Sequence, residues 1–290
     1  MNSYVKLCLS MIIWGTLGLF VLFSGLDYLS IAFYRCLFGA MTILLLTSKT
    51  VLNEIKKYSF TDYCMMITSG ILIVLNWVFL FKSFQLSSIT LGNVSYYTQP
   101  IFLILMGIFF FKEKVSRLKW VFILLTFIGV VLTANLTINH TLLHNTIFIG
   151  ALYALLAGFL YALAAVIVKK LNHVDSMYLT LIQLVSGIFI LLPFMNHNPL
   201  HFSAHQWSYL LIMGLIHTSL AYLLFYDSLK SLPMTVVAIL GYIDPIVAVI
   251  TDVIFFQQHL QLLQYAGISL TLFGSYYVLN SRKTVSHQHV

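Results

Sequence analysis

Apolar residues run along this chain in long blocks that are separated by short polar segments. A helix needs about 17–25 predominantly apolar residues to cross a bilayer, and ten blocks fall in that range. They lie at residues 5–26, 29–47, 63–84, 91–111, 120–136, 147–168, 177–194, 207–226, 235–256 and 262–279. Because no segment between them is long enough to fold as a soluble domain, the pattern predicts an all-α integral membrane protein with ten transmembrane helices.

The composition supports a membrane protein. Hydrophobic residues make up 60% of the sequence and charged residues only 8%, whereas about a quarter of the residues of a soluble domain are charged. Most of the protein surface is therefore expected to face the lipid bilayer.

Nearly all Lys and Arg residues lie in the loops after the second, fourth, sixth and eighth spans and near the chain ends. The remaining loops contain histidines but no Lys or Arg. Since basic residues are retained on the cytoplasmic side, this asymmetry predicts that both termini are cytoplasmic. The formal net charge of +7 is interpreted as topology and lipid-headgroup contact, and no nucleic-acid partner is expected.

The sequence contains an internal repeat at an offset of 145 residues. Residues 93–114 align with residues 238–259 without a gap, and a register shared over such a length indicates duplication. The matched pairs include Tyr97 with Tyr242, Pro100 with Pro245, Thr90 with Thr235 and Gly129 with Gly274. We predict a first five-helix repeat at residues 1–140, a second at residues 146–282 and a short cytoplasmic tail at residues 283–290.

Five crossings per repeat are an odd number, so the second copy must enter the membrane in the opposite orientation to the first. Two inverted copies can exchange conformations, which gives outward-open and inward-open states of similar energy. The predicted fold of two inverted five-helix repeats therefore favours a secondary transporter.

Pro100 and Pro245 lie near the middle of their spans. A proline inside a helix removes a hydrogen bond and displaces the carbonyl group four residues earlier, and such kinks persist at membrane depth only against protein or a wet cavity. Polar and aromatic side chains surround both kinks, namely Asn93, Tyr96, Tyr97, Gln99, Tyr242 and Asp244. Paired interruptions in the two halves predict the central binding site of a transporter.

Two aspartates lie in the span at residues 235–256. An aspartate at mid-bilayer costs about 2.5–3.5 kcal/mol on insertion scales, so Asp244 requires a reason for its position. Either it faces a polar cavity, where it ligates a cationic substrate group or titrates as a proton site, or it is structural and bonds to a neighbouring helix through His217 or Arg35. Asp252, near the outer end of the span, is interpreted as interfacial.

Several motifs resemble one known family. They are "IIWGTLG" (12–18), "AFYRCLFGA" (32–40), "YYTQPIFLILMGIFFFKEK" (96–114), "GVVL" (129–132), "GYIDPIVAV" (241–249) and "FGSYYVL" (273–279). Their order and duplication resemble the drug/metabolite transporter superfamily, in particular ten-helix members built from two EamA-type halves. One departure concerns the glutamate that often ends the ninth helix of such proteins, because here Gln258 stands where Glu113 stands in the first copy.

The resemblance implies a basket of helices in which spans 3, 4, 8 and 9, with 1 and 6, surround a central cavity. Such proteins commonly export amino acids and related metabolites from the bacterial cytoplasm across the inner membrane, without a cofactor. In this chain the predicted aromatic and polar walls are Trp14, Asn76, Trp77, Tyr161 and Tyr222. The alternative is that these side chains pack between helices or form interfacial belts.

Two further side chains have open roles. Arg35 either binds a substrate carboxylate or has a structural role near the outer face, where it can snorkel. His217 is a candidate for proton coupling together with Asp244, and otherwise a hydrogen-bonded structural histidine. His197, His201 and His205 recur at four-residue spacing, but Pro199 favours a loop there, and the three cysteines form no CxxC pair, so no metal site is expected.

We therefore predict a carrier that exports a small metabolite, an amino acid or a related zwitterion, with protons as a candidate coupling ion. The alternatives are an importer or exchanger of a nucleoside or amine, or efflux of lipophilic drugs. A channel or an intramembrane enzyme is less consistent with the sequence, since "LVSGIF" (184–189) has no glycine two residues before its serine and no HExxH motif is present. The expected form is a monomer or a homodimer.

Overall fold

The computed structural model describes residues 1–54, 57–87, 89–133, 145–195, 202–257 and 261–280. Within these ranges every regular element is a helix. In chain order the elements are α1 (Ser3–Gly15), α2 (Leu17–Ser24), α3 (Tyr28–Glu54), α4 (Phe60–Leu86), α5 (Ile89–Tyr96), α6 (Gln99–Phe111), α7 (Arg117–Thr133), α8 (Asn145–Lys170), α9 (Ser176–Leu191), η2 (Leu192–Phe194), α10 (Ala204–Ile212), η4 (Met213–Leu220), α11 (Ala221–Ser231), α12 (Met234–Gly241), α13 (Ile243–Phe256) and α14 (Leu262–Asn280).

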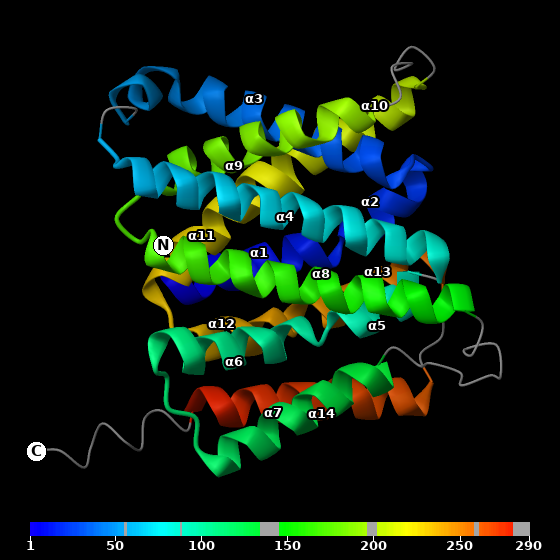
Figure 1. The fold of residues 1–290 in the computed structure, drawn as a ribbon. Helices are drawn as coiled ribbons and strands as arrows, with labels where there is room; N and C mark the ends of the chain where they lie inside the picture. Colours follow the sequence, from blue (N-terminus) through cyan, green and yellow to red (C-terminus); the bar gives the residue numbers. More distant parts are fainter. Residues whose placement is uncertain (55–56, 88, 134–144, 196–201, 258–260, 281–290) are drawn as a thin grey trace, which may run out of the picture.

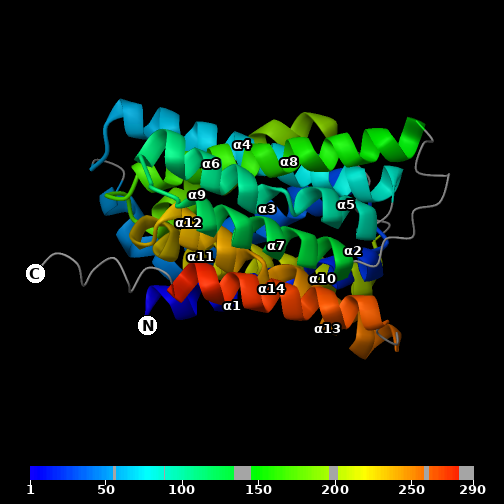
Figure 2. The same cartoon turned by 90° about the horizontal axis from the view of Figure 1, so that it is seen from below.

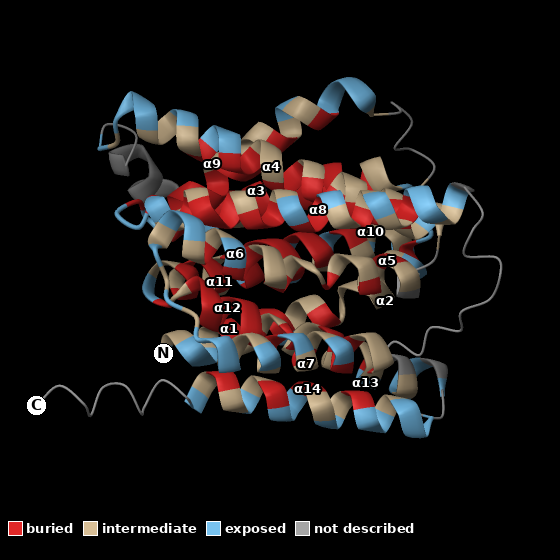
Figure 3. Cartoon of the chain, turned by 60° about the horizontal axis from the view of Figure 1, so that its bottom comes forward, coloured by how far each residue is buried: buried red, intermediate tan, exposed pale blue. Residues whose placement is uncertain are grey.

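The predicted spans are confirmed as helices. In the described ranges nine helical segments are long and apolar enough to cross a membrane, and α7, with 17 residues, occupies the remaining predicted span. Large apolar side chains cover the outside of the bundle, among them Leu45, Phe60 and Leu262. Figure 3 shows the complementary pattern, with buried positions gathered on the inward faces of the helices. The chain is a multi-pass membrane protein.

The helix contacts follow the inverted duplication. α4, the third span of the first copy, lies along α8, the first span of the second copy, and α11 lies along α1 in the equivalent exchanged arrangement. Spans that correspond to each other also pair directly, as α3 does with α9 and α6 with α12. Both ends of the described chain lie at the same end of the bundle (Figures 1 and 2), and we call this the termini end and the opposite one the far end.

The pair formed by α7 and α14 lies at one edge of the bundle (Figure 1). Small residues allow its two backbones to approach closely. A Cβ atom on Gly129 would lie 2.6 Å from Oγ1 of Thr271, and one on Gly267 would lie 2.6 Å from the carbonyl oxygen of Gly129. These two helices therefore hold each other at the periphery.

Four of the predicted spans are not continuous α-helices. The first is divided between α1 and α2 at Thr16, whose hydroxyl donates a hydrogen bond to the carbonyl of Ile13 at 2.8 Å. The fourth and ninth are divided at their prolines. The eighth contains the π-helix η4 between α10 and α11, and π segments are frequent at functional sites. The interruptions all occur in segments that approach the centre of the bundle.

The predicted boundaries of the two copies fall near residues 134–144, and these residues, like the predicted tail at 283–290, lie outside the described ranges.

Candidate functional site

Both prolines separate a pair of helices near mid-span. Pro100 lies in the first turn of α6, and Pro245 lies in the first turn of α13. A proline has no N–H group to donate and displaces the carbonyl group of the preceding turn, so each pair changes direction where the sequence predicts a kink. The two breaks lie against each other, because a Cβ atom on Gly241 would be 3.9 Å from Cγ of Pro100.

A glycine from the first span of the opposite copy contacts each break. A Cβ atom on Gly15 of α1 would lie 2.6 Å from Cβ of Val247 and 2.8 Å from the carbonyl oxygen of Asp244. A Cβ atom on Gly158 of α8 would lie 3.1 Å from Cβ of Gln99. The two copies thus hold each other's broken helices through the same kind of close contact, and the contact at Gly15 is the tighter one.

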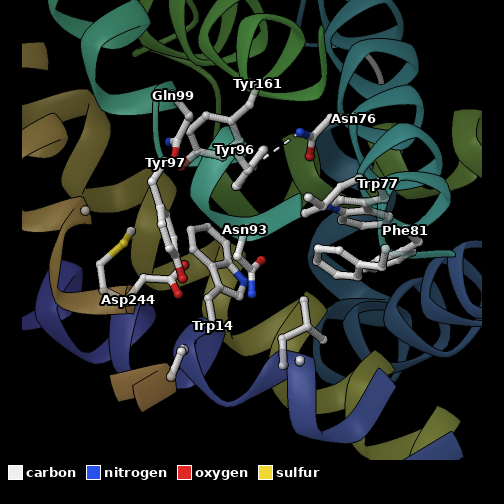
Figure 4. Close-up of a pocket in the computed structure, with 18 of the residues that line it drawn as sticks. Trp14, Asn76, Trp77, Phe81, Asn93, Tyr96, Tyr97, Gln99, Tyr161 and Asp244 are labelled. Carbon is white, nitrogen blue, oxygen red and sulfur yellow. Dashed lines mark hydrogen bonds between the residues drawn. The ribbon is translucent and has the colours of Figure 1, made fainter. Parts of the chain in front are cut away.

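A cavity of about 310 Å³ lies beside these breaks. It contains ten of the eleven side chains predicted to bind substrate, namely Trp14, Asn76, Trp77, Asn93, Tyr96, Tyr97, Gln99, Tyr161, Tyr222 and Asp244. Figure 4 shows all of these side chains except Tyr222, which it does not label, around one space between helices of both copies. All the spans expected from the family resemblance contribute to the wall, and α3 contributes as well through Arg35. The binding role of these residues stays a prediction.

Asp244 presents its carboxyl group to this cavity from the first turn of α13. Figure 4 shows that carboxyl group beside the side chain of Tyr97. Partial positive charge at a helix N-terminus favours a carboxylate in this position. Of the two roles left open by the sequence, the placement in the wall favours the cavity role.

Hydrogen bonds fix the polar atoms of the aromatic wall. The Nε1–H group of Trp77 donates to the hydroxyl of Tyr222 at 2.9 Å, and Nδ2 of Asn76 donates to the hydroxyl of Tyr96 at 3.2 Å and to the carbonyl of Ala157 at 2.7 Å. The ring of Trp14 packs edge-on against Tyr222, with 4.8 Å between the centroids. The wall is therefore a set of rings whose polar groups are already oriented, as preorganised sites require.

Arg35 lies in the same cavity wall and is only 1% exposed. Its Nε–H group donates to Oγ1 of Thr218 at 3.1 Å, and its guanidinium carbon lies 4.2 Å from the centre of the Trp77 ring. The side chain therefore does not snorkel to the outer face, which was one of the two possibilities that the sequence left open. Arg35 instead adds a cation to the cavity.

His217 and Tyr242 lie behind the wall. Nε2 of His217 is 3.0 Å from the hydroxyl oxygen of Thr16, and its backbone carbonyl accepts a hydrogen bond from Nε1 of Trp14 at 2.9 Å. Tyr242 is 1% exposed. Neither side chain is among the described residues that line the cavity, so the proton-coupling role predicted for His217 would have to act through Thr16 or Trp14.

The termini end is held together by contacts between the two copies. Glu113, just after α6, accepts hydrogen bonds from the backbone N–H groups of Met234 (2.6 Å) and Thr235 (3.0 Å), and from the Thr235 hydroxyl (2.6 Å). Its carboxylate thereby caps the first turn of α12, where the helix dipole is positive. Lys6 forms an ion pair with Asp227 at 2.5 Å nearby. Leu22, Phe84 and Thr251 line the opposite side of the cavity, which extends toward the far end.

Some predicted features fall elsewhere. Among the described residues no group of three or more His, Cys, Asp or Glu side chains is placed to hold a metal ion. His197, His201 and Gln258 lie outside the described ranges, as does the side chain of Asp252, so their predicted roles are untested.

Sequence reasoning missed several apolar wall residues, including Met11, Gly18 and Leu22 on α1 and α2, and Phe81 and Phe84 on α4. Helical spacing provides the signal that would have found them, because positions three and four residues apart share a face. Phe81 and Phe84 follow Trp77 by four and seven residues, and Gly18 and Leu22 follow Trp14 by four and eight.

Comparisons with known proteins agree with this architecture. A model of the EamA-like transporter family matches residues 1–135 and again residues 148–280. The "Uncharacterized transporter YxxF" of Bacillus subtilis is 30% identical over 94% of this chain and 88% of its own length. An "Uncharacterized transporter" of Archaeoglobus fulgidus is 27% identical over 85% of this chain and 87% of its own length.

One solved crystal structure, described only as that of a protein, superimposes with a TM-score of 0.78 at 12% sequence identity, over 96% of this chain and 97% of its own. At that identity the likeness shows the fold alone. The family match, by contrast, covers both copies and almost the whole chain, and the similar proteins are named as transporters. The resemblance seen in the sequence is confirmed, and the chain belongs to the EamA-like transporter family.

Proposed function

We propose that this protein is a secondary active transporter that moves amino acids or related zwitterions out of the cytoplasm by alternating access. One observation carries the proposal: a cavity lies where two inverted, proline-broken helix pairs meet, and the carboxyl group of Asp244 lies in its wall. Binding sites at the junction of inverted repeats and broken helices are the arrangement that alternating access uses.

The two ends of the cavity support a rocking mechanism. The termini end is held by the Glu113 cap on α12 and by the Lys6–Asp227 ion pair, both of which join the first copy to the second. The cavity extends instead toward Leu22 and Phe84 at the far end. If the termini are cytoplasmic, as the distribution of Lys and Arg predicts, this conformation faces outward, and the exchanged conformation of the two copies faces inward.

The size and character of the cavity favour a small amphipathic substrate. A volume of about 310 Å³ is at the lower end of the range of roughly 300–1,000 Å³ for small-molecule sites. Aromatic rings with oriented polar edges suit an apolar side chain, and a carboxyl group suits an amino group. Asp244 then either engages the substrate amino group or carries a coupled proton in exchange for it.

Export from a bacterial cytoplasm is the direction that we propose, with the protein in the inner membrane. The direction follows the export that is common among the transporters that the sequence resembles, and the bacterial relative that is named as a transporter supports the inner membrane. Coupling to the proton gradient follows from the acid in the cavity wall, since protonation of Asp244 would release a bound ammonium group.

Counterflow in proteoliposomes tests the proposal. Vesicles are loaded with one member of a panel of amino acids, amines, nucleosides or lipophilic cations, and uptake of labelled compound is followed for the wild type and for Asp244→Asn. We expect saturable exchange of amino acids that Asp244→Asn abolishes and that Asp252→Asn, the same change two turns further along α13, retains. If only nucleosides, amines or lipophilic cations are exchanged, the proposed substrate class is wrong and the exchanged class takes its place. If the flux neither saturates nor shows counterflow, the protein is a channel and not a carrier.

A further inference from the structure

The strongest unexplained feature of the cavity is its cation. Arg35 is 1% exposed and lies about two turns from the start of α3. A buried arginine within a membrane is energetically costly unless its donors form hydrogen bonds. Its Nε–H group has a partner in Thr218, but Nη1 has no hydrogen-bond partner among the described residues although it is buried. In that part of the chain no carboxylate lies within salt-bridge distance of the guanidinium group. Arg35 therefore carries a buried donor without a described partner, on a residue that forms part of the cavity wall.

The surroundings hold this guanidinium group in one orientation. The Thr218 hydroxyl donates to the carbonyl of Met213 at 2.9 Å, an arrangement that spans five residues of the π-helix η4. Its oxygen is therefore left to accept from Nε of Arg35. On the other side the guanidinium group lies over the Trp77 ring at 4.2 Å, and Phe81 follows at 5.6 Å. The Trp77 ring on one side and the hydrogen bond to Thr218 on the other therefore restrict the rotation of the planar guanidinium group.

The charges of the cavity define what can fill it. Among the described residues that line it, Arg35 and Asp244 are the two charged side chains, and they do not form an ion pair with each other. One cation and one anion that do not pair with each other, in a wall rich in aromatic rings, match a molecule that carries both charges. A phosphate dianion would leave a negative charge unmatched beside Asp244, so a carboxylate monoanion is the better partner for Arg35.

We propose that Arg35 binds the carboxylate of the transported zwitterion through the guanidinium donor that has no partner in this conformation, and that Thr218 of η4 is the positioning residue that orients the guanidinium group. This inference rests on the proposed function and names the half of the substrate that Asp244 does not recognise. The substrate would span the cavity, with its carboxylate at Arg35, its amino group at Asp244 and its side chain among the rings.

The test compares acids with analogues that lack the carboxylate charge. The probes are alanine, leucine and phenylalanine, each with its carboxamide and with the corresponding primary amine, used as competitors of amino-acid counterflow in proteoliposomes. A charge-assisted hydrogen bond supports a preference of roughly 10- to 100-fold for the acid over the amide. We expect that preference in the wild type, a loss to about twofold in Arg35→Gln, and an intermediate value in Arg35→Lys, which keeps the charge but not the fork.

Two matched variants in η4 separate positioning from packing. Thr218→Val removes the hydroxyl that holds Nε of Arg35, and we expect it to lower the preference for the acid. Ser219→Ala removes the neighbouring hydroxyl, which donates to the carbonyl groups of Gly39 and Gly214 at 2.9 and 3.2 Å. The described hydrogen bond of Arg35 goes to Thr218 and not to this hydroxyl. Ser219→Ala is expected to leave the preference unchanged. If Ser219→Ala lowers the preference as much as Thr218→Val, the positioning role is overturned.

A cross-test uses the other charge. Asp244→Asn should remove the preference for phenylalanine over 3-phenylpropionate, which lacks the amino group, and should keep the preference for phenylalanine over its amide. Because Asp244→Asn is expected to abolish counterflow, its competitor affinities are read from ligand-induced shifts of the melting temperature in detergent. These shifts also report whether each Arg35 variant is folded.

The possible failures are distinct. If the wild type exchanges amino acids and Arg35→Gln still prefers acids to amides, the role of Arg35 is overturned and the proposed function stands. If the wild type exchanges no amino acid, or exchanges amines equally well, the proposed function and the role of Arg35 both fail.

Discussion

The two broken helix pairs share a backbone and differ in chemistry. The residue before the proline is Gln99 in α6 and Asp244 in α13, an amide in one copy and an acid in the other. Fourteen residues later the order is reversed, with Glu113 after the first pair and Gln258 after the second. Each copy thus has one carboxyl group at one of two equivalent positions, and the two copies use different positions.

The shared backbone of the two breaks suits alternating access, and their difference in charge suits recognition of a substrate. Exchange of conformations between inverted halves depends on equivalent backbones, and both pairs break at a proline and pack on a glycine of the other copy. A zwitterion, by contrast, carries one charge of each sign, so equal charges at the two equivalent positions would not match it. The acid of the second copy is therefore available to the cavity, and the acid of the first copy to the contact that holds the termini end.

The largest effect should follow from a substitution that gives both positions before the prolines, Gln99 and Asp244, an uncharged amide side chain. Asp244→Asn leaves an amide in both copies and removes the carboxyl group from the cavity wall, so we expect amino-acid counterflow to fall at least tenfold. Gln99→Asn shortens the equivalent side chain without changing charge and should stay within about twofold of the wild type. Both are measured as initial rates in proteoliposomes at equal protein density.

Equal losses in the two variants would contradict the asymmetry, because they would show that shape at the break matters and charge does not. Normal counterflow by Asp244→Asn would remove that carboxyl group from the transport mechanism altogether.

The sequence predicted the fold well because its signals are local or repeated. Span length and the two prolines act through backbone hydrogen bonding in lipid, and they predicted the spans and the breaks. The 145-residue register is the mark of a duplication, and with five spans per copy it predicted the inversion. Of the six polar and aromatic side chains predicted around Pro100 and Pro245, five line the cavity and Tyr242 does not, and such side chains have few alternatives at that depth. The other predicted wall residues came from the family resemblance.

The remaining features depend on how helices are rotated against each other, which no local pattern encodes. The sequence could not decide whether Arg35 faces the cavity or the membrane interface, because the direction of its side chain depends on the hydrogen bond to Thr218. Thr218 lies in the π-helix η4, and no proline in the sequence signals that interruption. The break at Thr16 and the cap formed by Glu113 on α12 likewise join segments far apart in the chain.

The next effect concerns the glycines that contact the breaks. Gly15→Ala would place a Cβ atom 2.6 Å from Cβ of Val247 and 2.8 Å from the backbone carbonyl oxygen of Asp244. Gly158→Ala would place one at 3.1 Å from Cβ of Gln99, which is less tight. Overpacking typically costs about 1–3 kcal/mol. We expect Gly15→Ala to lower counterflow several-fold and to reduce the melting temperature in detergent, and Gly158→Ala to do so less. A larger defect in Gly158→Ala would show that the first break, not the second, is the more constrained.

A smaller effect should come from the acid at the termini end. Glu113→Ala removes the cap of α12, a loss of about 1 kcal/mol, and should favour opening of that end by roughly fivefold. The readout is the maleimide reaction rate of Leu232→Cys, a buried position there, in a background without the native cysteines. Asp27→Ala, which removes a carboxylate that caps the first turn of α3 within the first copy, should leave the rate unchanged. Equal rates in wild type and Glu113→Ala would show that this contact does not hold the end closed.

The smallest expected effect concerns the hydrogen bonds of Asn76, which connect α4 to the broken pair α5–α6 and to α8. Asn76→Ala removes the hydrogen bonds to the hydroxyl of Tyr96 and the carbonyl of Ala157, each worth about 1 kcal/mol. The melting temperature should fall by a few degrees, and counterflow should fall about twofold, because Gly158 still holds the α5–α6 break against α8 and no charge is lost. A loss as large as that of Asp244→Asn would mean that the neutral pair recognises the substrate as strongly as the acidic pair, and the division of roles between the two copies would not hold.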